Sequence, residues 1–116
     1  LFRSIKGTSD YGRAFEHWFI KEIVHNAKTL NKEDRFSFYR VDENIEVDLI
    51  IQKPNKEMIA IEIKSSNNPK IKDLKGLKSF AKIFPEAKLI CASQIDYPVI
   101  EDGIRVLPWQ VLLDEI

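Results

Sequence analysis

The 116-residue sequence has one cysteine, four glycines, five prolines and no excess of charge of either sign. The single cysteine, Cys91, excludes a disulfide framework and favours a reducing compartment, so we expect a cytoplasmic protein with Cys91 as a small buried side chain. No apolar run approaches the roughly 20 residues that span a bilayer, so we expect no membrane-spanning helix. The sequence has no repeats, and its length supports one globular domain over residues 1–116.

The charges balance overall but are distributed unevenly along the chain. Lysine and arginine number 18, as do aspartate and glutamate, which argues against a dedicated nucleic-acid-binding domain. Between Lys64 and Lys82, however, there are six lysines and one acid, Asp73. This segment could follow a phosphate backbone or form a solvated helix face, and the sequence leaves both interpretations open.

Two apolar segments carry charges at Asp48, Glu62 and Lys64. Charges inside apolar strands are costly to bury unless they have a partner or a function. Alternation places Asp48 on one strand face with Glu46 and Ile50, and Lys64 on one face with Glu62. Lys64 could there orient a water nucleophile or stabilise developing negative charge. The alternative is an exposed hairpin in which Glu62 and Lys64 merely face water.

A hairpin should join these two segments, because residues 54–56 read Pro-Asn-Lys, a typical turn sequence. If Lys53 pairs with Glu57, counting along the strands places Asp48 opposite Glu62, with Cβ atoms roughly 5 Å apart. Two carboxylates at this distance raise the pKa of one of them unless a cation lies between them. Oxygen ligands suit Mg²⁺ or Mn²⁺, so we expect such a metal here.

The first helix is expected over residues 10–30, with Glu16 at the edge of its apolar stripe. An acid at this edge suits a residue that points into a site, although an acid near a helix start can also simply stabilise the helix dipole. Glu22 lies on another face of the helix.

The rest of the chain alternates strands and helices. We expect strands over residues 36–41, 45–51, 59–64, 86–92 and 104–107, a helix over residues 72–84 and a terminal helix opened by Pro108. Gly76 costs roughly 1 kcal/mol in a helix relative to alanine, which close approach to a strand or a ligand would explain. The order αβββαβ with a C-terminal βα extension predicts an α/β (α+β) domain with a mixed sheet.

Asp48, followed fourteen positions later by Glu62-Ile63-Lys64, resembles the core of the PD-(D/E)xK nuclease superfamily. Its members share a restriction-endonuclease-like αβββαβ core and cut nucleic acid with Mg²⁺, and an acid from the first helix, matched here by Glu16, often joins the site. The resemblance implies that the catalytic residues are Glu16, Asp48, Glu62 and Lys64. It also implies that Asp48, Glu62 and the backbone carbonyl of Ile63 hold Mg²⁺ or Mn²⁺, with Glu16 assisting through a bound water or a second ion.

A closer resemblance covers nearly the whole chain. It rests on an ordered set of motifs, namely Gly12-x-x-Phe15-Glu16, Tyr39-Arg40, Glu46-Val47-Asp48, Ile61-Glu62-Ile63-Lys64-Ser65-Ser66, Leu74-Lys75-Gly76-Leu77 and Val106-Leu107-Pro108-Trp109. The set resembles the uncharacterised nuclease-like C-terminal domain of predicted AAA+ ATPases from bacteria and archaea. It implies a covalently linked ATPase domain, and since the sequence starts at Leu1 rather than Met, we expect a fragment of such a longer protein.

ATP binding is not expected within this segment. Residues 7–12 have the glycine spacing of a P-loop, but Arg13 and Ala14 stand where that motif needs lysine and then serine or threonine.

These observations together predict a metal-dependent DNA nuclease. The residues expected to contact nucleic acid are Arg40, Lys70, Lys72, Lys75 and Lys78, although Arg40 could instead form a surface ion pair with Glu46. The alternative is a catalytically inactive nuclease-fold module that binds protein or nucleic acid and regulates the ATPase, and the zero net charge favours it. Many enzymes that cut both strands act as dimers, so a homo-oligomer is open as well.

Overall fold

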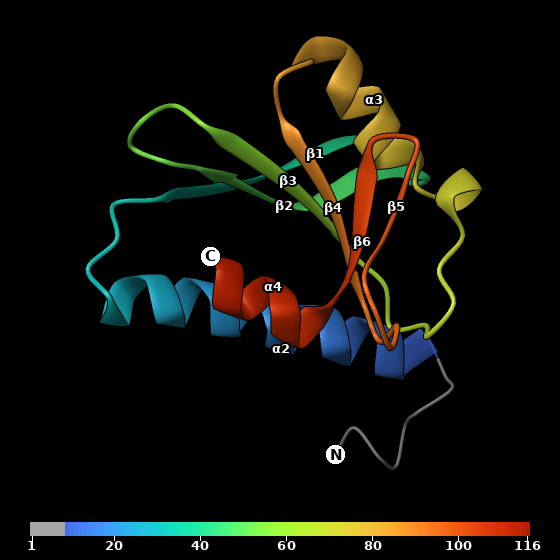
Figure 1. Ribbon diagram of the computed structural model, residues 1–116, viewed down its shortest axis with the longest axis horizontal. Helices are drawn as coiled ribbons and strands as arrows, with labels where there is room; N and C mark the ends of the chain where they lie inside the picture. Colours follow the sequence, from blue (N-terminus) through green and yellow to red (C-terminus); the bar gives the residue numbers. More distant parts are fainter. Residues whose placement is uncertain (1–8) are drawn as a thin grey trace.

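The computed structural model describes residues 9–116, which form a six-stranded mixed sheet with helices on both faces (Figure 1). The elements are α2 (Ser9–Thr29), β1 (Arg35–Asp42), β2 (Ile45–Gln52), β3 (Met58–Ile63), the 3₁₀ turn η1 (Ile71–Asp73), α3 (Lys75–Ile83), β4 (Lys88–Ser93), β5 (Val99–Glu101), β6 (Ile104–Pro108) and α4 (Trp109–Glu115). The strands lie in the order β1-β2-β3-β4-β6-β5, and β4 runs parallel to β3 and β6. The predicted α/β class with a mixed sheet is confirmed. Gly7 and Thr8 of the P-loop-like segment lie outside the described residues.

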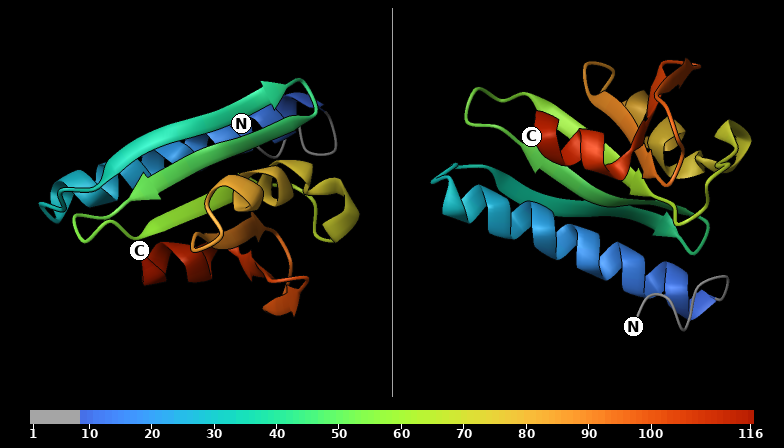
Figure 2. Two further views of the ribbon diagram at one scale, coloured as in Figure 1. Left: turned by 90° about the horizontal axis from the view of Figure 1, so that it is seen from above. Right: turned by 60° about the horizontal axis from the view of Figure 1, so that its bottom comes forward.

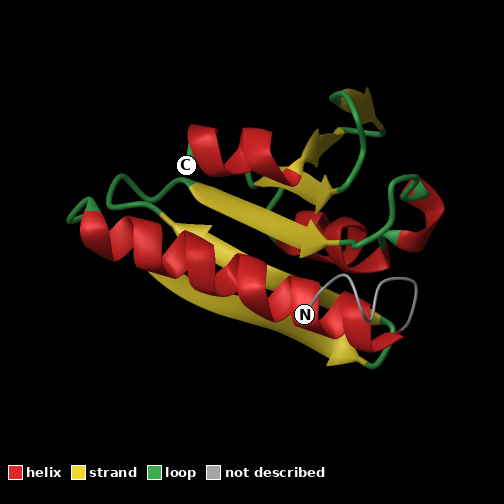
Figure 3. Ribbon diagram, turned by 90° about the horizontal axis from the view of Figure 1, so that it is seen from below, coloured by secondary structure: helices red, strands yellow, loops and turns green. Residues whose placement is uncertain are grey.

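Helices α2 and α4 lie on one face of the sheet and α3 lies on the other (Figure 3). Figure 2 shows α2 running along β1 and β2, while α4 contacts β4 and β6. The buried stripe of α2 recurs every fourth residue, at Tyr11, Phe15, Phe19, Ile23 and Ala27. Trp18 of α2 meets Trp109 of α4 edge to face, with ring centroids 5.1 Å apart. This packing fixes the position of the first helix, which carries Glu16.

The hairpin between β2 and β3 has the predicted register. The Lys53 N–H donates to the Glu57 carbonyl at 2.8 Å, and the antiparallel pairing continues to Leu49 opposite Ile61. The regular pairing ends there, one step before Asp48 and Glu62 would face each other.

A β-bulge interrupts β2 at Asp48. Ser37 of β1 pairs with Ile50 and Tyr39 pairs with Val47, so two steps along β1 correspond to three along β2. Val47 and Ile50 consequently pack in the same apolar cluster beneath α3, although simple alternation would put them on opposite faces. Bulges of this kind commonly redirect a side chain beside a functional site.

The C-terminal half departs from prediction in two places. The helix expected over residues 72–84 is divided into η1 and α3, with a break at Leu74. The short strand β5 was not expected, and it forms a hairpin with β6 through Asp102 and Gly103, which have φ values of 53° and 76°. An Asp-Gly pair in this conformation is a favoured two-residue hairpin turn.

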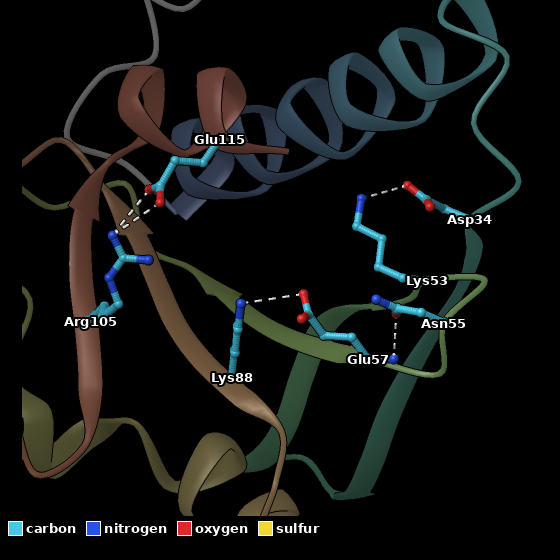
Figure 4. A network of polar contacts seen from close by, with 7 residues as sticks. All are labelled: Asp34, Lys53, Asn55, Glu57, Lys88, Arg105 and Glu115. Carbon is cyan, nitrogen blue, oxygen red and sulfur yellow. Dashed lines mark hydrogen bonds and ion pairs between the residues drawn. The ribbon is translucent and has the colours of Figure 1, made fainter.

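Ion pairs connect several helices, strands and loops away from the β-bulge at Asp48 (Figure 4). They join Arg105 to Glu115, Lys88 to Glu57 and Lys53 to Asp34. The Lys53–Asp34 pair, at 3.0 Å, is the most buried of the three, because the Asp34 side chain is only 5% exposed. None of the helices within residues 9–116 combines the length and apolar character needed to cross a membrane.

Candidate active site

A polar cavity of about 330 Å³ lies where β2 begins and β3 ends. It is lined by Glu16, Glu43, Asn44, Glu46, Asp48, Glu62, Ile63, Lys64, Asp73 and Lys75. The four predicted catalytic residues therefore line one cavity, although they come from α2, β2 and the end of β3. The lining holds six carboxyl groups and only two lysines, so its charge attracts a cation.

Asp48 is held between its two neighbouring elements. Its Oδ2 accepts a hydrogen bond from the Ile63 N–H of β3 at 2.7 Å, and its carboxyl hydrogen-bonds the Glu16 carboxyl of α2. Asp48 thus reaches toward α2, whereas Ile50 packs beneath α3. The predicted placement of Asp48 and Ile50 on one face is wrong, because the bulge shifts the alternation by one residue.

Burial perturbs the titration of both acids in this pair. Burial is the main reason that the pKa of Asp48 is raised to about 7. The hydrogen bond from the Ile63 N–H lowers this pKa, and the negative charge of Glu16 raises it. The pKa of Glu16 is also raised, chiefly by burial, although its hydrogen bond to Asp48 opposes the change. Near neutral pH Asp48 is therefore partly protonated, and the two neighbouring carboxyls influence each other's titration.

Glu62 is the most buried acid of the cavity, with 5% of its surface exposed. Its Oε1 accepts a hydrogen bond from the Leu77 N–H of α3 at 3.1 Å, and its Oε2 lies 3.6 Å from the Lys64 Nζ. Burial raises the pKa of Glu62 to about 7, even though Lys64 and the Leu77 N–H favour the ionised form. The Lys64 side chain is 39% exposed, so it can reach both Glu62 and a molecule in the cavity.

The donor set suits a magnesium-like ion that keeps much of its own water. Within residues 9–116, no three side chains of histidine, cysteine, aspartate or glutamate already surround a common metal position. Mg²⁺ is typically bound through one or two carboxylates and retains several waters. Asp48 and Glu62, with Ile63 lining the same cavity, match that pattern, and an ion there would relieve the repulsion between the carboxylates.

The predicted nucleic-acid contacts occupy different places. The Arg40 Nε lies 3.8 Å from Glu46 Oε2 with both side chains exposed, so the surface ion pair of the two alternatives is formed. Lys75 lines the site cavity, and Lys70 lines an adjoining hollow of about 190 Å³ together with Lys64. The other two predicted lysines, Lys72 and Lys78, are exposed and line neither space.

Several cavity residues were not predicted as site residues. Glu46 stands two positions before Asp48, and its place in the same acidic strand was an available signal. The Leu77 N–H could not be found in this way, because every residue except proline has a backbone N–H and the residue type does not show which one contacts a site. Cys91, the strand neighbour of Glu62, is fully buried as expected, and burial raises its thiol pKa to about 12, so it stays uncharged.

Comparison with known proteins gives one match. Residues 11–112 match the family described as "Domain of unknown function (DUF4143)". No curated protein and no solved structure matches the chain significantly. The matched description names no activity.

Proposed function

The chain belongs to the DUF4143 family, and we propose that it is a metal-dependent nuclease domain that hydrolyses phosphodiester bonds in DNA. The observation that carries this proposal is the meeting of Glu16, Asp48, Glu62 and Lys64 in one cavity of about 330 Å³. The raised pKa values of the acids support it further, because strongly perturbed groups in a cleft are typical of functional sites.

Each group would have a distinct task. Asp48, Glu62 and the Ile63 carbonyl would hold Mg²⁺ or Mn²⁺, which when bound neutralises phosphate charge and lowers the pKa of a coordinated water. Metal binding would displace the proton from Asp48, because a carboxyl group binds a metal as the carboxylate. The Lys64 ammonium would donate hydrogen bonds to the attacking water or to a phosphate oxygen as negative charge develops.

Substrate binding would involve the lysines around the cavity. Those proposed to contact the phosphate backbone are Lys70, Lys72, Lys75 and Lys78, all of which are exposed. Since Lys75 lines the cavity and Lys70 the adjoining hollow, these two would lie nearest the reacting phosphate.

Calorimetric titration with Mg²⁺ and Mn²⁺ tests the metal site first. We expect binding by the wild-type protein and no binding by Asp48→Ala, which lacks a ligand. Lys64→Met should retain the metal but lower cleavage of plasmid DNA by on the order of 100-fold, the usual cost of losing a group that stabilises transition-state charge. Absence of binding at millimolar metal would refute the proposal of an autonomous enzyme.

A second candidate is an inactive nuclease-fold module that binds protein or nucleic acid and regulates a linked ATPase. It is favoured by the zero net charge and by exposed Glu43 and Glu46, which would repel phosphates at the cavity. For such a module, Asp48→Ala would leave partner binding unchanged, and neither protein would cleave DNA with metal present. Cleavage by the wild-type protein alone would exclude it.

A further inference from the structure

We propose that Gly76 is a positioning residue, which lets the first turn of α3 approach β2 closely enough for the Leu77 N–H to hold the Glu62 carboxylate. The consequence for metal binding rests on the proposed function, whereas the positioning itself does not. No role for the first turn of α3 follows from the family match.

The approach of α3 to β2 leaves no room for a side chain at position 76. A Cβ atom there would lie 1.9 Å from the carbonyl oxygen of Glu46 and 2.4 Å from its carbonyl carbon. Both atoms belong to the backbone of β2, so they cannot rotate away as a flexible side chain would. The first turn of α3 would have to retreat by about 1.5 Å to restore ordinary contact distances.

This close approach brings an unpaired helix donor to the site. The first N–H groups of a helix have no partner within the helix, and the N-cap residue of α3, Leu74, offers no side-chain hydrogen bond. The Leu77 N–H instead donates to Glu62 Oε1 at 3.1 Å. A retreat of about 1.5 Å would take the Leu77 nitrogen out of hydrogen-bond range of Glu62 Oε1, since a contact beyond about 3.6 Å is no longer a hydrogen bond.

The same turn therefore makes three different contacts at three consecutive residues. Lys75 lines the cavity, Gly76 sits against the β2 backbone, and Leu77 fixes one oxygen of Glu62. With Oε1 held by α3, the other carboxylate oxygen, Oε2, remains directed toward Lys64, 3.6 Å away. Alanine at position 76 would therefore release the Glu62 carboxylate from the Leu77 N–H, and Lys75 would move with the first turn of α3.

The Leu77 amide gives a direct readout by nuclear magnetic resonance. Gly76→Ala should move its proton resonance upfield, in the same direction as Glu62→Ala, because each change breaks the hydrogen bond to the carboxylate. Phe80→Leu is the matched control, since it disturbs a buried residue of the same helix whose ring contacts Tyr39 of β1. An unmoved Leu77 resonance in Gly76→Ala would overturn the inference.

Metal binding gives the second readout. Gly76→Ala should weaken Mn²⁺ binding by about tenfold or more, as expected when a group that orients a ligand is lost, whereas Phe80→Leu should not weaken it. Equal affinity in Gly76→Ala and the wild-type protein would overturn the inference and leave the proposed function standing. If the wild-type protein binds no metal, the proposed function fails, and the Leu77 resonance still decides the positioning role.

If Gly76→Ala does not fold, the hydrogen bond between the Leu77 N–H and Glu62 can still be tested in the wild-type protein. Its Leu77 amide should then exchange with solvent as slowly as the buried amides of α3. Fast exchange at Leu77 would show that Glu62 does not hold this donor and would overturn the inference.

Discussion

Replacing Asp48 by asparagine should stabilise the protein while abolishing metal binding. Asparagine keeps an oxygen that can accept from the Ile63 N–H, and its amide can donate to the Glu16 carboxyl. It removes only the negative charge, which burial disfavours. The substitution should therefore raise stability and lower metal affinity, which distinguishes the energetic cost of burying the carboxylate from its role as a metal ligand.

The magnitude follows from the difference in pKa between the folded and unfolded chain. Burial raises the folded-state pKa of Asp48 from 3.8 to about 7, and each unit corresponds to about 1.4 kcal/mol. Because the folded-state value is the higher one, the contribution of Asp48 to stability is complete below about pH 4 and is lost as the pH rises through about 7. At about pH 8 the ionised group costs at most about 4 kcal/mol, and we expect Asp48→Asn to recover between about 1 and 4 kcal/mol.

Urea unfolding at several pH values measures this difference. The gain from Asp48→Asn should be near zero at about pH 4, where the wild-type carboxyl is protonated in the folded state, and should grow through about pH 7. Adding Mg²⁺ at ten times its dissociation constant should stabilise the wild-type protein by about 1.4 kcal/mol and the variant not at all.

Asp34→Asn is the matched control. Asp34 is also buried, but it forms an ion pair with Lys53 at 3.0 Å, so removing its charge leaves that lysine without a partner. The same substitution should therefore destabilise the protein at this position. Our reasoning about Asp48 is refuted if Asp48→Asn is less stable than the wild-type protein at about pH 8, or if its gain is equal at all pH values.

Two further predictions use pairs of equivalent substitutions. Glu16→Gln should weaken Mn²⁺ binding by about tenfold or more through loss of a carboxyl that contacts Asp48, whereas Glu22→Gln, at an exposed position of the same helix, should not change it; equal calorimetric affinities would remove Glu16 from the site. Lys53→Ala should lower the free energy of unfolding by about 1–3 kcal/mol in urea, because it leaves the buried Asp34 carboxylate without its partner. Lys88→Ala breaks an exposed pair and should lower it by under about 0.5 kcal/mol. Equal losses would contradict the assigned difference in burial.

Local patterns predicted most of the fold. The turn at residues 54–56 set the hairpin register, and the bond between Lys53 and Glu57 confirms it. The strand β5 was missed because its three residues are largely exposed and have no apolar alternation, but the Asp102-Gly103 pair was a usable turn signal. Sequence patterns therefore identify an element well when it buries one face, and poorly when only its turn defines it.

The charged residues that line the cavity could be found in the sequence, but their geometry could not. The spacing of Asp48, Glu62 and Lys64 identified the charged residues, yet the bulge that turns Asp48 toward Glu16 depends on how β1 pairs with β2. The contact of Gly76 with the β2 backbone likewise depends on the packing of α3 across the sheet. Both features arise between segments distant in sequence, and neither leaves a periodic signal.

The chemistry of the cavity supports a role that requires negative charge. Asparagine at position 48 could accept the Ile63 N–H, and glutamine at position 62 could accept the Leu77 N–H, so neither hydrogen bond needs a carboxylate. Both residues are nevertheless acids whose pKa burial raises to about 7, which destabilises the folded chain near neutral pH. A structural role gains nothing from that destabilisation, whereas a divalent cation bound between the two carboxylates would offset it. The pH dependence of stability and the metal affinity should therefore change together when either acid is replaced by its amide.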